Sequence, residues 1–198
     1  KQFGCIMKEI LLIGGGGHCK SVIDVIEQEG KFQIVGIIDK AELLGSNVLG
    51  YSIIGVDSDL ENLSKKYSYA LVTIGQIKSS KLRKSLFDLA KKAGFTLPSI
   101  ISPRAYISKN AVIGNGVVVM HDVLINANAS IGDNCIINSK ALIEHDTKVA
   151  EHCHISTNTT INGGVVVESG SFIGSSAVIR DSILIKKNSF IKAGSLIK

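Results

Sequence analysis

The chain has 198 residues, a formal net charge of +5, no tryptophan and only 5% aromatic residues, so a large core must be aliphatic. Its Lys and Arg residues are scattered and no RNA- or DNA-binding motif occurs, which argues against nucleic acid and favours anionic small molecules as partners. No apolar run is long enough for a signal peptide or a membrane span, and the four cysteines show no zinc-binding spacing. We therefore expect a cytoplasmic protein with no membrane insertion and no metal.

The first half of the chain alternates apolar strands with amphipathic helices. In the helix expected after the third strand, Leu82, Leu86 and Leu89 form the apolar stripe, and Asp57 is the expected cap of the helix before it. This order predicts a small parallel α/β unit. The strands are predicted over residues 8–13, 33–38 and 70–74, and the helices over residues 18–28, 57–66 and 78–93.

A glycine-rich turn joins the first strand to the first helix. Gly14, Gly16 and Gly17 belong to it and His18 follows, so backbone N–H groups at the helix start can meet an anion. The form G-x-G-x-x-C lacks the third glycine of a dinucleotide fingerprint, and Asp39 ends the second strand where an acidic ribose ligand would lie. A nucleotide or nucleotide-sugar therefore fits better than a nicotinamide cofactor, and a plain structural turn is the alternative.

The carboxyl end of the third strand, at Gly75, is a further expected contact, because ligands of such sheets bind where the strands end.

The second half repeats every six residues without a break. A period of six is a multiple of the strand period of two and fits a helix poorly, so it predicts stacked strands. All seventeen positions in step with Ile101 are Ile or Val: Ile101, Ile107, Ile113, Val119, Ile125, Ile131, Ile137, Ile143, Val149, Ile155, Ile161, Val167, Ile173, Ile179, Ile185, Ile191 and Ile197. The residue four positions after each of these is mostly small.

This pattern resembles the left-handed β-helix of the hexapeptide-repeat acyltransferases, in which three hexads make one triangular coil. The expected organisation is a tag remnant or disordered lead over residues 1–7, a Rossmann-like nucleotide-sugar-binding domain over residues 8–100, and a left-handed parallel β-helix acetyltransferase domain over residues 101–198. Both prolines of the chain, Pro98 and Pro103, lie at the junction.

The stretch from Asn138 to Asp146 reads N-S-K-A-L-I-E-H-D. With the glycine-rich, His-containing first loop, it makes residues 8–197 similar to the sugar acetyltransferases of the sialic acid O-acetyltransferase (NeuD) and bacillosamine-pathway N-acetyltransferase (PglD) group. The resemblance implies that His145 is the catalytic base, with Asn138 and Asp146 as supporting groups. It also implies that His18 and His154 contact the sugar nucleotide.

The coenzyme contacts are expected at Gly163, Ile161 and Ser175. Gly163 follows His145 by eighteen residues, so the next coil places a residue without a side chain beside the ring and leaves room for a thioester. Imidazole is the side chain suited to act as a base at neutral pH. Many members of the family carry a G-V-P-A-containing tail after the β-helix, and this sequence lacks that motif, which leaves the adenine end of the coenzyme without an assigned contact.

Together with these residues, the resemblance implies an acetyl-CoA-dependent N-acetyltransferase that acts on a nucleotide-linked 4-amino-6-deoxy sugar in bacterial surface glycan or glycoprotein biosynthesis. O-acetylation of sialic acid-like sugars is the alternative, and a metal-dependent protein resembling γ-carbonic anhydrases is a third hypothesis.

The position before each core aliphatic residue is apolar in twelve of sixteen hexads, including Val118, Leu124 and Val178. This outer stripe predicts packing against other subunits, and the family resemblance implies a homotrimer with active sites between chains.

Overall fold

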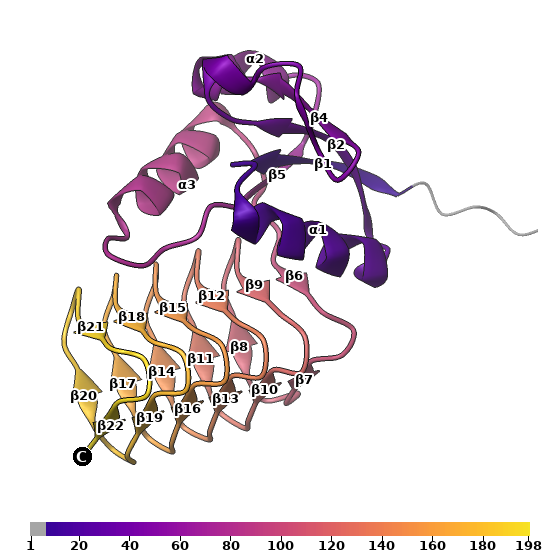
Figure 1. The fold of residues 1–198 in the computed structure, drawn as a ribbon. Helices are drawn as coiled ribbons and strands as arrows, with labels where there is room; N and C mark the ends of the chain where they lie inside the picture. The colour runs from indigo at the N-terminus through magenta and orange to yellow at the C-terminus, as the bar shows by residue number, and fades with distance from the viewer. Residues whose placement is uncertain (1–6) are drawn as a thin grey trace, which may run out of the picture.

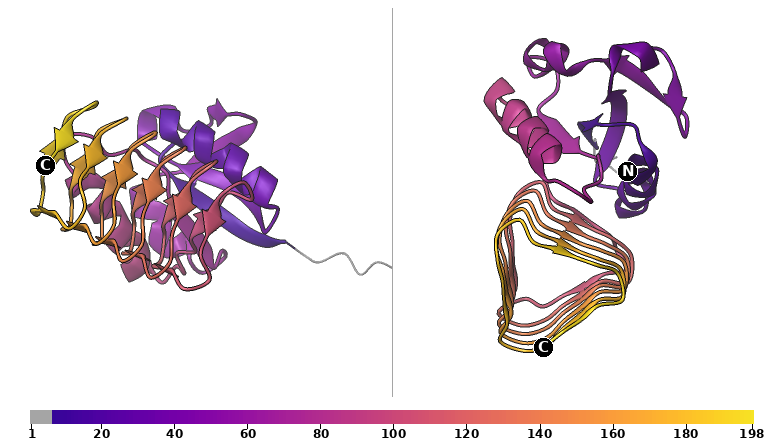
Figure 2. Two further views of the ribbon diagram at one scale, coloured as in Figure 1. Left: turned by 90° about the horizontal axis from the view of Figure 1, so that it is seen from below. Right: turned by 60° about the vertical axis from the view of Figure 1, so that its left-hand side comes forward.

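The computed structural model describes residues 7–198, so nearly all of the predicted lead segment lies outside the described residues. The described chain forms an α/β unit that sits on one side of a triangular prism of short strands (Figures 1 and 2). None of the helices within residues 7–198 is both long and apolar enough to cross a membrane.

The N-terminal unit is a five-stranded sheet in the order β3-β4-β2-β1-β5, parallel except for the β3–β4 pair. Its buried strands are rich in Ile, Leu and Val, as expected of a sheet covered on both faces. Helix α1 lies on one face and α3 on the other (Figure 1). The elements are β1 (Lys8–Ile13), α1 (Gly17–Glu29), β2 (Phe32–Ile38), β3 (Asn47–Val48), β4 (Tyr51–Gly55), α2 (Leu60–Leu63), β5 (Tyr69–Val72) and α3 (Lys81–Ala93), with 3₁₀ turns at Ala41–Leu43 and Asp57–Asp59.

Two local predictions in this unit are wrong. The side chain that caps the turn before α2 is Asp59, which accepts a hydrogen bond from the Val56 N–H at 2.9 Å, and not Asp57; the α-helix itself has only four residues. The stripe on α3 is also rotated from the predicted one. Leu82 and Leu89 are exposed, whereas Arg83, Leu86, Phe87 and Ala90 are buried. The reason is that α3 is covered on a second side by the β-helix, where the Phe87 ring meets the His152 ring.

The prism is a left-handed parallel β-helix of two-residue strands in three faces. The docked face contains β6 (Ile100–Ile101), β9 (Val118–Val119), β12 (Ile136–Ile137), β15 (His154–Ile155), β18 (Phe172–Ile173) and β21 (Phe190–Ile191). The apolar face contains β7 (Tyr106–Ile107), β10 (Leu124–Ile125), β13 (Leu142–Ile143), β16 (Thr160–Ile161), β19 (Val178–Ile179) and β22 (Leu196–Ile197). The mixed face contains β8 (Val112–Ile113), β11 (Ser130–Ile131), β14 (Lys148–Val149), β17 (Val166–Val167) and β20 (Leu184–Ile185).

Stacked strands are eighteen residues apart, as the register of Ile137 with Ile155 shows. The in-step Ile and Val side chains point inward and pack with the small residues four positions later into one aliphatic core. Many corners contain a residue with a positive φ near 60°, for example Asn128, Lys140 and Asp146, which lets the chain turn sharply between faces. The repeat therefore fixes both the core and the position of every corner.

The docked face packs against the chain's own N-terminal unit. Ile100 and Val118 are buried in a cluster with residues of α1, and Ile136 is buried too. The prediction that the outer stripe packs on other subunits is therefore wrong for Val118 and Ile136, whereas Phe190 at the far end of the docked face is exposed. Leu124 and Val178 lie on the apolar face and stay partly exposed. The N-terminal unit leaves that face uncovered (Figure 2).

Candidate active site

His145 lies at the corner between the apolar and mixed faces, the corner that the docked face does not reach. Its side chain is 63% exposed, and its Nδ1 lies 2.8 Å from Oδ2 of Asp146. Asp146 itself is held by the Asn128 side chain, which donates from Nδ2 to Oδ1 at 2.6 Å. Because the carboxylate accepts, Nδ1 bears the proton and Nε2 is left as the free lone pair. This geometry orients the ring and leaves Nε2 able to accept a proton.

The charges around the ring favour its protonated form. The hydrogen bond to Asp146 raises the pKa of His145, and Glu144 adds a smaller effect in the same direction. The Asn128 hydrogen bond and the imidazole lower the pKa of Asp146, so its carboxylate is ionised at neutral pH. The Glu144 carboxylate is held in turn by the Asn126 amide at 2.8 Å.

Gly163 lies directly against the imidazole. A Cβ at this glycine would stand 2.7 Å from Cε1 of His145, closer than side-chain atoms approach one another. The ring therefore occupies the space that any other residue would fill. The open hollow around the ring has a volume of about 530 Å³ and is lined by Glu144, His145, Asp146, Asn162, Gly163, Gly164, Asp181 and Ser182.

Replacing Asp146 by asparagine should move the acid limb of the rate profile. A base is active only when unprotonated, so the rate falls as the pH drops through the pKa of His145. Asp146 raises that pKa, so in Asp146→Asn the limb should shift to lower pH. The kcat on the plateau above that pKa should also fall. The asparagine amide can donate to Nδ1 of His145 and so favour the tautomer that carries its proton on Nε2. The measurement is kcat against pH, with Asp181→Asn in the same hollow as the matched control; a limb that stays in place in Asp146→Asn would contradict the role of the pair.

Other predicted residues do not meet His145. Asn138 lies at the corner between the docked and apolar faces, where its amide donates to Nε2 of His154 at 3.4 Å. It is therefore not a supporting group of His145 within one chain. Ser175 lies at the same corner, and its hydroxyl is 2.9 Å from that of Ser156. Ile161 is one of the inward core residues and fully buried, so its side chain cannot reach a coenzyme.

His154 and His18 lie together where the N-terminal unit meets the docked face. Their ring centroids are 6.5 Å apart. Burial lowers the pKa of His18 to about 3 and that of His154 to about 4, and the Arg83 charge acts in the same direction on both. Both rings are therefore neutral at physiological pH. The Nε2 atom of His18 is buried and has no hydrogen-bond partner among the described residues.

The glycine turn and the strand ends border a second hollow of about 380 Å³, into which Gly14, Asp39, Lys40, Asp57 and Ser58 face. Oδ2 of Asp39 accepts the Gly15 N–H at 2.5 Å and so holds the turn, rather than projecting freely. Gly14 adopts a φ of +104°, and a Cβ there would strike the Ile74 side chain. At Gly16 and Gly17 a Cβ would meet no atom within 4 Å, and Gly75 lies beside His18.

The sequence pattern does not single out two important side chains of this region. Gln76 and Arg83 are buried between the N-terminal unit and the β-helix and join the two by hydrogen bonds. Nothing in the local sequence pattern marks Arg83, since the predicted stripe of α3 leaves it facing solvent.

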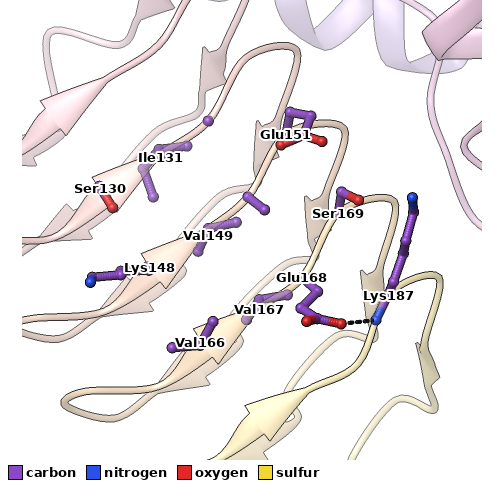
Figure 3. Close-up of a pocket in the computed structure, with 12 residues that line it drawn as sticks. Ser130, Ile131, Lys148, Val149, Glu151, Val166, Val167, Glu168, Ser169 and Lys187 are labelled. Carbon is purple, nitrogen blue, oxygen red and sulfur yellow. Dashed lines mark hydrogen bonds between the residues drawn. The ribbon is translucent and has the colours of Figure 1, made fainter.

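A further hollow of about 440 Å³ on the mixed face contains none of the predicted catalytic groups (Figure 3). Among residues 7–198, no three His, Cys, Asp or Glu side chains form a group that could hold a metal ion.

Comparison with known proteins accounts for both parts of the chain. Residues 9–90 match the PglD N-terminal domain, and residues 128–163 match the bacterial transferase hexapeptide repeats. A histidine-to-asparagine variant of perosamine N-acetyltransferase from Caulobacter crescentus, in complex with CoA and GDP-perosamine, is 33% identical with a TM-score of 0.91. The match covers 98% of this chain and 90% of that one.

The acetyltransferase domain of PglB from Neisseria gonorrhoeae is 31% identical with a TM-score of 0.89, and the match covers 96% of this chain and 91% of that one. WeeI from Acinetobacter baumannii, at 20% identity and a TM-score of 0.62 over 96% of each chain, shares the fold. No curated protein sequence matches. The chain therefore belongs to the NeuD/PglD-type sugar acetyltransferases and is an acyltransferase that uses acetyl-CoA.

Proposed function

We propose that this protein transfers the acetyl group of acetyl-CoA to the amine of a nucleotide-linked 4-amino-6-deoxy sugar. The observation that carries the proposal is the oriented imidazole of His145, which lies against Gly163 in an open hollow of about 530 Å³. The similarity to perosamine N-acetyltransferase, solved with CoA and GDP-perosamine, supports an amino sugar as acceptor. The product would serve bacterial surface glycan or glycoprotein biosynthesis.

In the proposed reaction, the amine nitrogen attacks the thioester carbonyl carbon while both substrates are bound. Nε2 of His145 takes the proton from the nitrogen, and the Asp146 carboxylate stabilises the imidazolium that forms. We assign the oxyanion donor to the backbone at Gly163, where no side chain intervenes. The C–S bond then breaks, and the imidazolium returns the proton to the leaving thiolate. No covalent enzyme intermediate is needed.

The two halves of this site lie at different places on one chain. His145 occupies the corner opposite the docked face, whereas His18, His154 and the glycine turn lie on the docked side (Figure 2). We therefore propose that a complete site forms between chains, with His145 of one subunit facing the acceptor half of its neighbour. The glycine turn and the 380 Å³ hollow would hold the nucleotide, and His18 and His154 the sugar.

A homotrimer would meet this requirement with the apolar faces turned toward the threefold axis. Light scattering should give three times the 21.0 kDa chain mass at micromolar concentration. Val178→Asp on the apolar face should reduce that mass, because it buries a charge in the interface. Leu184→Asp on the mixed face is the matched control, since Leu184 is the more exposed of the two. A stable monomer of the unmodified chain would refute the shared site.

Gly16→Val should weaken binding of the sugar nucleotide selectively. Gly16 has φ −74° and ψ −168°, which valine can adopt, and no atom lies within 4 Å of its Cβ position, so the fold should tolerate the change. The new side chain blocks the approach of phosphate to the start of α1. We expect the KM for the sugar nucleotide to rise about tenfold or more, with the KM for acetyl-CoA nearly unchanged. Ser21→Val on the outer side of α1 is the control; equal effects on both constants would make the turn purely structural.

The acceptor itself is tested by release of free CoA thiol. The protein is mixed with acetyl-CoA and, in turn, with UDP-, GDP- and dTDP-linked 4-amino-6-deoxy sugars, and with free or CMP-linked sialic acid. Acetylation of an amino sugar at nitrogen, seen by mass spectrometry and NMR, is the expected result. Thiol release with the sialic acid acceptors alone would replace N-acetylation by O-acetylation, and thiol release with none of them would reject the proposed acceptor class.

A further inference from the structure

Arg83 on α3 is the largest side chain in the fully buried set, with an exposed fraction of 1%. Backbone carbonyls hold its guanidinium, and no carboxylate among the described residues does. Burial lowers the pKa of Arg83 to about 10, so the group still carries its charge at neutral pH. A buried charge without a counter-ion is costly and destabilising by itself. Its presence here calls for a role other than stability.

The guanidinium joins the N-terminal unit to the β-helix. Nη1 donates to the carbonyls of Val72 and Ile74, both at 2.8 Å, where the chain leaves β5. Nε donates to the carbonyl of Asn134, a β-helix corner residue, at 3.3 Å. These contacts clamp the segment that follows β5 against the corner.

Gln76 comes two residues after the clamped Ile74 carbonyl. Its Nε2 donates to the carbonyl of His152 at 2.9 Å, which fixes the segment to the next coil. The backbone carbonyl oxygen of Gln76 lies 2.5 Å from Nδ1 of His154. A carbonyl only accepts, so Nδ1 of His154 bears the proton and Nε2 is a hydrogen-bond acceptor, as the contact from the Asn138 amide also requires.

We propose that Arg83 is a positioning residue for the acceptor half of the active site. It clamps residues 72–76 so that the Gln76 backbone carbonyl holds His154 as the Nδ1–H tautomer. Nε2 is then an acceptor, which a donor on the sugar can reach by replacing the long, 3.4 Å contact from the Asn138 amide. His154 would then accept a hydrogen bond from the amine or a hydroxyl of the sugar, and would not act as a base. The kinetic part of this inference rests on the proposed function; the state of the His154 ring does not.

The test is Arg83→Met in the full chain, with Lys84→Met, an exposed neighbour on α3, as the matched control. Long-range ¹H–¹⁵N spectra report the tautomer of each ring, and the chain has only five histidines. The unmodified protein should show a neutral Nδ1–H ring for His154, identified by its loss in His154→Gln. In Arg83→Met this signal should become a mixture of tautomers. The pKa of His154 should also rise, since a positive charge that faces His18, His152 and His154 has been removed.

In the acetyl-transfer assay, Arg83→Met should lower kcat/KM for the acceptor about ten- to a hundredfold, the range expected when a binding group is misplaced. The KM for acetyl-CoA should stay within twofold. Arg83→Lys, which keeps the charge and some donors, should recover part of the loss.

Unchanged tautomer signals and unchanged kinetics in a folded Arg83→Met would overturn the proposal. Should that variant not fold, Gln76→Ala releases the segment from the His152 carbonyl while Arg83 stays in place. The same change in the His154 signal is expected, and an unchanged signal would overturn the proposal equally. If the wild type acetylates no amino sugar, the proposed function fails, while the tautomer experiment still decides whether Arg83 sets the ring.

Discussion

His145→Ala should lower kcat by about 10²- to 10⁴-fold, the usual contribution of a general base. A factor of a hundred corresponds to about 2.7 kcal/mol of barrier. The loss follows from the proposed mechanism, in which the free Nε2 of His145 accepts the proton and Asp146 holds the ring in place. Acetyl-CoA binding should survive, since the imidazole is assigned to the reacting amine and not to the body of the coenzyme.

The fold should survive as well, because the His145 side chain is 63% exposed and contributes nothing to the aliphatic core. Calorimetric titration with CoA and the melting temperature check these two points alongside turnover. His152→Ala is not a suitable control because His152 is buried, whereas Lys140→Ala changes an exposed corner residue. A His145→Ala enzyme with near-normal turnover of its natural acceptor would remove His145 from the mechanism.

Gly163→Val should have an effect of similar size through a different cause. A Cβ at position 163 would meet the far end of a side chain, Cε1 of His145, at 2.7 Å. The ring can rotate away, so stability should change little, but the base would then leave its place. Misplacement of this kind costs about 10²-fold in rate. We expect kcat to fall about a hundredfold and the KM for acetyl-CoA to rise, because the added methyl groups also fill the space for the thioester.

The matched control is Lys109→Val, at the equivalent corner position three coils earlier and exposed. It adds the same side chain to the same kind of turn away from the site. Gly163→Ala gives an intermediate case with one carbon. Retention of full activity in Gly163→Val would show that the ring does not need its observed position.

The β-helix can be predicted almost completely from the sequence, because its period is an interior packing rule. Each in-step Ile or Val must point inward, and the eighteen-residue coil follows from three such hexads. The same arithmetic predicts that Gly163 lies against His145, and the two residues do meet there. Local periodicity thus carries both the core and one contact of the site.

How the two parts of the chain meet cannot be predicted in this way. The outer position of a hexad reads the same whether it faces solvent, another subunit or the chain's own N-terminal unit, so the pattern alone assigns Val118 to the wrong partner. The predicted stripe on α3 is wrong for the same reason, since a second packing surface turns Arg83 inward. Asn138 is near His145 in the sequence, but it lies at another corner, beside His154. Tertiary docking decides the first two, whereas the corner of Asn138 follows from the six-residue period, which places it one corner before His145.

The most direct test of the shared active site is a subunit-mixing experiment. His145→Ala is expected to be nearly inactive, and Gly16→Val to be only weakly active at sugar-nucleotide concentrations far below its KM. One variant is defective in the acetyl-transfer half and the other in the acceptor half. The two are unfolded together, refolded as mixed trimers and assayed for CoA release at such a concentration, with native mass spectrometry confirming the mixture.

If each site takes His145 from one chain and the glycine turn from its neighbour, random mixing restores about a quarter of the sites, and activity should return to about a quarter of the wild-type value. Each variant refolded alone is the control. If both halves come from the same chain, every site in the mixture keeps one defect. Confirmed mixed trimers without recovered activity would therefore contradict the account.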